Sequence, residues 1–130
     1  MGVFQHPITL FDALGQRRET VQAVVDTGAT FSSFPAPLLA GLGVTPIRTI
    51  QVRLANGQEE RWAMGQVEAE LDGTRGPILC LFGSPGAPPL IGSHALEAFL
   101  LTVDPVEKRL VPKEAYLLCC HASIQNRLRL

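Results

Sequence analysis

The feature that most constrains this chain is an acidic residue at the end of an apolar, strand-like run. Residues 23–30 read Ala-Val-Val-Asp-Thr-Gly-Ala-Thr, so two valines lead directly into Asp26. A valine-rich strand belongs in a core, where an unpaired carboxylate costs several kcal/mol. Asp26 must therefore leave the core at once, find hydrogen-bond partners, or serve chemistry. Thr27 adds a hydroxyl, and Gly28 lets another chain or a substrate approach the backbone closely.

The length and composition indicate one folded domain with many turns and short strands. The 130 residues suffice for one core but not for two sizeable ones. A hydrophobic fraction of 46% is typical of a folded protein, and 12 Gly with 10 Pro favour a β-rich design. The net charge of -1 gives no electrostatic footprint for nucleic acid or anionic lipid. No apolar run approaches the roughly 18 residues that span a membrane. We therefore expect neither a nucleic acid nor a membrane as a partner.

The cysteines do not indicate a disulfide framework, because there are three of them and Cys119 and Cys120 are adjacent. Reduced thiols in a cytoplasm are the plainer expectation. The opening Met-Gly-Val-Phe-Gln-His lacks the basic and apolar regions of a signal peptide and misses the myristoylation pattern, so we expect a cytoplasmic protein. A zinc site at Cys119-Cys120-His121 stays an alternative, although a structural site needs four well-spaced ligands. We expect no metal and no cofactor.

Apolar runs and alternating patterns predict strands along most of the chain. They fall at residues 8–11, 18–25, 31–35, 49–54, 59–71, 78–82, 90–92, 101–103 and 109–111. Tight turns are expected at Gly15-Gln16, Asp72-Gly73 and Asn56-Gly57, the last as a type I′ turn in which both residues have positive φ. Residues 94–100 predict a helix with Ser93 as its N-cap, and residues 36–40 favour one or two helical turns.

Three features together resemble the retropepsin-like aspartic proteases, the single-domain relatives of pepsin that include the retroviral enzymes. They are Asp26-Thr27-Gly28-Ala29, the hairpin at Asn56-Gly57 where the family has its flap, and Leu90-Ile91-Gly92 followed by a helix. The resemblance covers about residues 7–112. It implies a mostly β fold, a closed β-barrel with one short C-terminal helix before the last hairpin. We expect the domain at residues 1–118 and a C-terminal tail at 119–130.

The resemblance implies peptide hydrolysis by two carboxylates that share one proton. One acts as a base toward water and the other as an acid toward the carbonyl oxygen, and their like charges keep both from ionising together. The chain holds one Asp-Thr-Gly, since Asp72-Gly73-Thr74 has the wrong order and neither Asp12 nor Asp104 follows an apolar strand and precedes a glycine. We therefore expect Asp26 of a second subunit to supply the other carboxylate, in a two-fold homodimer.

The resemblance also implies roles for residues around Asp26. Thr27 would hydrogen-bond across the two-fold axis, Gly28 would present its backbone to the substrate, and Ala29 would complete the active-site loop. The flap would close over an extended peptide that binds as an added strand, and Ile91 with Gly92 would pack beneath the catalytic loop. The expected substrate-binding residues are Thr30, Ala55, Asn56, Gly57, Gln58, Ile91 and Gly92.

Two positions depart from the retroviral pattern, and plainer interpretations stay open. Thr30 and Ser93 stand where retroviral members often carry an Asp–Arg ion pair, and the only glycine at the flap tip is Gly57.

Asp26-Thr27-Gly28 could be a plain turn, and Asn56-Gly57 a plain hairpin. The predicted function is an aspartic endopeptidase acting on a peptide or protein substrate. The alternatives are a proteolytically inactive dimeric peptide-binding or scaffold module and a metal-binding domain that uses the C-terminal thiols.

Overall fold

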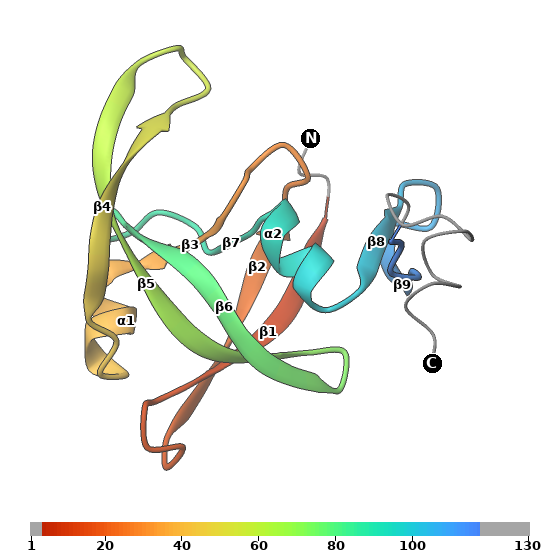
Figure 1. Cartoon of the computed structure of the whole chain (residues 1–130), viewed down its shortest axis with the longest axis horizontal. Helices are drawn as coiled ribbons and strands as arrows, with labels where there is room; N and C mark the ends of the chain where they lie inside the picture. The colour runs from red at the N-terminus through yellow and green to blue at the C-terminus, as the bar shows by residue number, and fades with distance from the viewer. Residues whose placement is uncertain (1–3, 118–130) are drawn as a thin grey trace, which may run out of the picture.

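The computed structural model describes residues 4–117, and these are mostly β (Figure 1). Within them lie nine strands and two short helices. In chain order they are β1 (Gln5–Phe11), β2 (Arg18–Val25), β3 (Ser32–Pro35), α1 (Ala36–Gly41), β4 (Pro46–Arg53), β5 (Glu59–Leu71), β6 (Thr74–Gly83), β7 (Leu90–Ile91), α2 (Ser93–Ala98), β8 (Leu101–Asp104) and β9 (Arg109–Pro112). The tail expected at 119–130, with its Cys119-Cys120-His121, lies outside the described residues.

Seven strands form one sheet in the order β1-β2-β7-β3-β6-β5-β4, and β8 pairs with β9 in a separate two-stranded sheet. Strand β1 also pairs with β5, from Thr9 opposite Glu70 to Phe11 opposite Glu68. The large sheet therefore curls until its first strand contacts β5 as well as β2. Strand β4 is left at the sheet's edge, where the β4–β5 hairpin projects from the body of the molecule (Figure 1).

Strand β7 is two residues long but joins the two halves of the sheet. It runs parallel to β2, with Val25 opposite Ile91, and antiparallel to β3, with Ser33 opposite Leu90. Asp26 is the next residue along the chain after β2, and Gly92 is the next after β7. The pairing therefore brings two loops together that are more than sixty residues apart in sequence.

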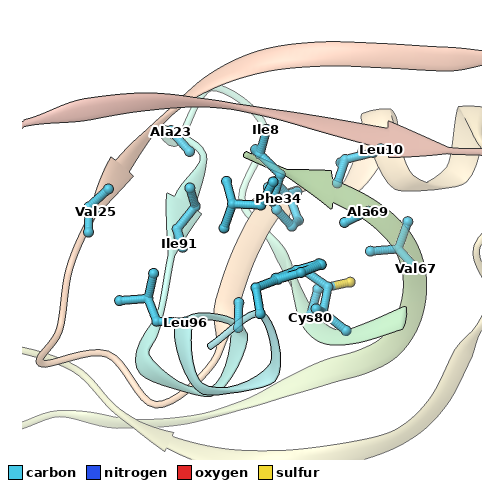
Figure 2. Packing of buried hydrophobic residues seen from close by; sticks show 14 of the residues in the cluster. Ile8, Leu10, Ala23, Val25, Phe34, Val67, Ala69, Cys80, Ile91 and Leu96 are labelled. Atoms are coloured by element: carbon cyan, nitrogen blue, oxygen red, sulfur yellow. The ribbon is translucent and has the colours of Figure 1, made fainter. Parts of the chain in front are cut away.

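The core lies inside the curled sheet and is covered at one side by α2 (Figure 2). Alternating residues of β1, β2, β5 and β6 point into it, as Ile8 and Leu10 do from β1, because successive side chains of a strand face opposite ways. Phe34 from β3 and Leu39 from α1 are fully buried. The other buried members of this cluster are Ala23, Val25, Leu42, Val67, Ala69, Leu71, Ile78, Cys80, Ile91, Ala95, Leu96, Phe99, Leu101 and Leu110.

The predicted strands are all present, and the mostly β prediction is confirmed. The helical turns expected at residues 36–40 are present as α1, with a proline in the first turn, so the described residues hold a second short helix besides the one before the last hairpin. The expected cap at Ser93 is wrong: Gly92 is the N-cap of α2, and no side chain caps it. The N–H groups of Ser93 and His94 instead donate to backbone carbonyls of the loop after Asp26, so a capping hydroxyl is not needed.

The hairpin turns at Asp72-Gly73 and Asn56-Gly57 differ from each other. Asp72 and Gly73 both have positive φ, 51° and 83°, as a type I′ turn requires. At Asn56-Gly57 the type I′ prediction is wrong, because Gly57 has φ 88° while Asn56 is not among the residues with positive φ. The longer loop closes through bonds from Gly57 N–H to Leu54 C=O at 2.9 Å and from Leu54 N–H to Gln58 C=O at 2.7 Å.

Neither helix in the described part of the chain is long and apolar enough to cross a membrane.

Candidate active site

Asp26 leaves the core at the end of β2 and is half-buried. Its N–H donates to the Ile91 carbonyl at 2.9 Å, which continues the pairing of β2 with β7 by one residue. Its carboxylate Oδ1 accepts the N–H of Gly28 at 2.9 Å, and its carbonyl accepts the N–H of Ala29 at 3.2 Å. The acidic side chain is thus held in a tight loop by main-chain groups, at the boundary between the core and solvent.

The first turn of α2 holds the other side of this loop. The N–H of Ser93 donates to the Ala29 carbonyl at 2.7 Å, and the N–H of His94 donates to the Thr30 carbonyl at 2.9 Å. Helix N-termini leave backbone N–H groups without partners inside the helix, and here the loop carbonyls take them. The helix and the loop therefore satisfy each other's backbone groups.

Gly92 and Ser32 close the contact between loop and helix. The Gly92 N–H donates to Ser32 Oγ at 3.1 Å, and Ser32 is fully buried. An added Cβ at Gly92 would lie 2.5 Å from the Phe31 carbonyl oxygen, closer than real Cβ contacts come. We did not single out Ser32 from the sequence, although a serine pair between Phe31 and Phe34 in an extended, apolar stretch marked an unusual place for a hydroxyl.

A cavity of about 300 Å³ lies between the loop and the edge strand β4. Its walls are residues 28–31 of the loop, residues 50–53 of β4, and Leu81 of β6. Because β4 is at the sheet's edge, backbone groups on its outer side are open to pair with an extended peptide, as in strand addition. The arrangement suits a peptide laid between the Asp26 loop and the projecting hairpin.

Apart from Asp26 and Thr27, the predicted site residues fall into three groups. Gly28, Ala29 and Thr30 line the cavity beside β4. Ile91 and Gly92 are buried beneath the loop. Residues 55–58 (Ala55, Asn56, Gly57 and Gln58) are exposed at the hairpin tip and do not line this cavity.

Thr27 does not line the cavity beside β4. It is exposed and lines a larger cavity of about 560 Å³ on the other side of the loop, together with Phe4, Leu96 of α2 and Val103 of β8. The cavity is mainly apolar, with Glu97 and Lys113 among its walls, and these two side chains pair at 2.5 Å.

The cavity walls from β4 were not predicted as site residues. The sequence did show their alternation, with Ile50 and Val52 on one face and Gln51 and Arg53 on the other. What it could not show is that this strand, rather than the hairpin tip beyond it, lies against the loop.

No group of three His, Cys, Asp or Glu side chains that could hold a metal ion occurs among residues 4–117.

The fold matches that of retropepsin-like proteases. The protease of simian foamy virus (mac) superposes with a TM-score of 0.53 at 18% identity, over 73% of this chain and 93% of that one. The retroviral protease-like domain of Ddi1 from Leishmania major gives 0.56 at 18% identity, over 88% and 91%. The foamy viral protease–reverse transcriptase in complex with an RNA/DNA hybrid gives 0.55 at 15% identity, over 88% of this chain and 13% of that longer one.

The sequence itself matches the aspartyl protease family over residues 11–93, and the chain belongs to that family. The match includes Asp26-Thr27-Gly28 and extends to Gly92 and Ser93. The resemblance to retropepsin-like aspartic proteases is therefore confirmed. No curated protein matches the chain.

Proposed function

We propose that this protein is an aspartic endopeptidase whose catalytic dyad is formed by Asp26 from each of two subunits. The observation that carries the proposal is the setting of Asp26: its carboxylate is half-exposed and fixed by the Gly28 N–H. The loop that bears it borders a cavity beside a free strand edge. An ordinary turn after a strand would not need the main-chain bonds with α2 and β7 that position the loop bearing this carboxylate.

The dyad chemistry requires a second carboxylate, because one must accept a proton from water while the other donates to the peptide carbonyl. One chain supplies one Asp-Thr-Gly. A two-fold axis beside Asp26 would place two copies of the same group opposite each other, and their mutual repulsion would keep one proton between them. Gly28 would then present its backbone to the substrate, and residues 55–58 would close over it.

The homodimer is supported by Thr27 and the larger cavity that it lines. Thr27 follows Asp26 directly and is exposed in this chain, and so is available to meet a second copy near the axis. The cavity of about 560 Å³ behind it carries apolar walls that a partner would cover. We also propose that the sheet closes into a barrel, which the pairing of β1 with both β2 and β5 supports. A cytoplasmic location remains part of the proposal.

The test is cleavage of a quenched fluorescent peptide library at mildly acidic pH by wild type and by Asp26→Asn. We expect wild type to cleave, EDTA to leave cleavage unchanged, a statine-type inhibitor to block it, and Asp26→Asn to abolish it. Sedimentation at micromolar concentration should show twice the chain mass. Equal cleavage by wild type and Asp26→Asn, or a strictly monomeric active species, would contradict the proposal.

A dimeric peptide-binding module without proteolysis is the second candidate, and the hairpin favours it. Glu59 accepts hydrogen bonds from Arg53 and Gln51, and Asn56 donates to Gln58 at 3.1 Å. Each of these exposed contacts contributes little by itself, but together they favour the present shape of the hairpin over the bending that closure over a substrate needs. The same peptide library distinguishes the peptidase from the binding module, because a binding module would bind peptides of the library without cleaving them.

A further inference from the structure

The cavity between the loop and β4 has apolar walls and one charged group. Ala29, Phe31, Ile50, Val52 and Leu81 contribute its apolar side chains. Of the described residues that line it, Arg53 alone carries a charge. A peptide side chain entering this cavity would therefore meet mostly hydrocarbon, with Arg53 as the one charged residue of the wall.

The guanidinium of Arg53 has capacity for a further partner. It pairs with Glu59 and donates to the Gly57 carbonyl through a long contact of 3.4 Å, and its side chain is 68% exposed. A guanidinium offers five N–H donors, more than these two contacts use. Its planar fork also matches a carboxylate in a two-point contact that an ammonium cannot make.

Glu59 is the group that competes with such a ligand. It lies directly opposite Arg53 in the β4–β5 pairing and also accepts a hydrogen bond from Gln51. The pair is exposed to solvent on both sides, so its own stability contribution is small. A peptide carboxylate can therefore share Arg53 with Glu59, or displace Glu59 from it, with little loss of stability.

We propose that Arg53 makes this cavity a subsite for an acidic peptide side chain, with glutamate favoured over lysine. The inference rests on the proposed peptide-binding site and names part of its substrate class. A glutamate stem of two methylenes would lie along the apolar walls while its carboxylate reaches Arg53. A lysine would bring its ammonium toward the guanidinium, where like charges repel.

The test measures binding rather than cleavage, so that it does not depend on catalysis. The probes are end-capped octapeptides of Ala, Leu and Phe that carry Glu, Gln or Lys at one position, scanned along the peptide. Their Kd values are measured by fluorescence anisotropy with Asp26→Asn and with Arg53→Gln, Arg53→Glu and Glu59→Gln added to it. Arg61→Gln is the matched control, because Arg61 lies on the same hairpin opposite Gln51 and does not line the cavity.

At one position of the scan, we expect the Glu peptide to bind about three- to tenfold tighter than the Lys peptide. Arg53→Gln should remove this ratio, Arg53→Glu should reverse it, and Glu59→Gln should increase it, while Arg61→Gln leaves it unchanged. An unchanged ratio in Arg53→Gln, an equal loss in Arg61→Gln, or no binding of any peptide would overturn the inference. If the ratio follows Arg53 but wild type cleaves none of the peptides, the peptidase proposal fails and the subsite stands.

Discussion

Replacing Gly92 with alanine tests whether the Asp26 loop is seated on β7 and α2. The backbone of Gly92 has φ -97° and ψ 178°, an extended conformation that alanine adopts without strain. The added Cβ would lie 2.5 Å from the Phe31 carbonyl oxygen and 2.9 Å from that of Ala29. Both are backbone atoms that cannot rotate aside, so the loop or the helix must move.

The expected loss follows from the contacts that this movement disturbs. Overpacking of a tight site costs about 1–3 kcal/mol. A shift of the loop also weakens the bonds from Ser93 N–H to the Ala29 carbonyl and from His94 N–H to the Thr30 carbonyl, each worth about 1 kcal/mol net. We therefore expect Gly92→Ala to lower the free energy of unfolding by about 3–5 kcal/mol, a large part of the total of a typical domain.

Urea unfolding at one fixed protein concentration measures this difference, because the proposed homodimer would make stability depend on concentration. Gly41→Ala is the control: Gly41 ends α1, and a Cβ there meets no atom within 4 Å. That variant should unfold within about 1 kcal/mol of wild type. Equal urea midpoints for Gly92→Ala and Gly41→Ala would show that the loop does not rest against Gly92, and would refute the site described above.

Two further residues give independent tests. Ser32→Ala should lower the free energy of unfolding by about 1–3 kcal/mol, because the Gly92 N–H is left buried without an acceptor; an unchanged urea midpoint would contradict this. Burial raises the pKa of the Cys80 thiol to about 12, so in a Cys119→Ser, Cys120→Ser background it should resist iodoacetamide at pH 8 and react once urea unfolds the chain. Rapid labelling of the native protein would exclude that burial. The same raised pKa predicts a pH effect: the thiol stays neutral in the fold and ionises in the unfolded chain near pH 9, so stability falls as pH rises from about 9 toward 12. Relative to Cys80→Ala, the protein should lose about 1.4 kcal/mol between pH 8 and 10, and parallel pH profiles of the two proteins would contradict the assignment.

The local structure was largely predictable because it depends on local patterns. Alternation over residues 49–54 and 59–71 predicted β4 and β5, since one apolar face gives a strand a period of two. Asp72-Gly73 predicted its turn because both residues tolerate positive φ. The type I′ prediction failed at Asn56-Gly57, where the loop runs from Leu54 to Gln58 and a different turn closes it.

The candidate site was predictable at Asp26 and along its loop, but not at the wall that β4 supplies. Asp26 was recognisable because a carboxylate directly after an apolar strand is costly unless it leaves the core, is hydrogen-bonded or serves chemistry. Ser32 did not stand out, because its acceptor role depends on Gly92, which lies sixty residues away. The contribution of β4 to the cavity was missed for the same reason: a sequence pattern gives the faces of a strand, but not which loop a sheet edge lies beside.

The missing Asp–Arg ion pair can be understood from these same contacts. Retroviral members often join the loop and the helix through that pair, and here the two positions hold Thr30 and Ser93. Their backbones still join the two elements, because the Thr30 carbonyl accepts from His94 and the Ser93 N–H donates to Ala29. Main-chain bonds of this kind do not depend on which side chain is present, provided that residue 92 has none. The loop can therefore keep its position although Thr30 and Ser93 carry no charge. The charged residue beside the proposed subsite is then Arg53 of β4, and it determines which charge the subsite accepts.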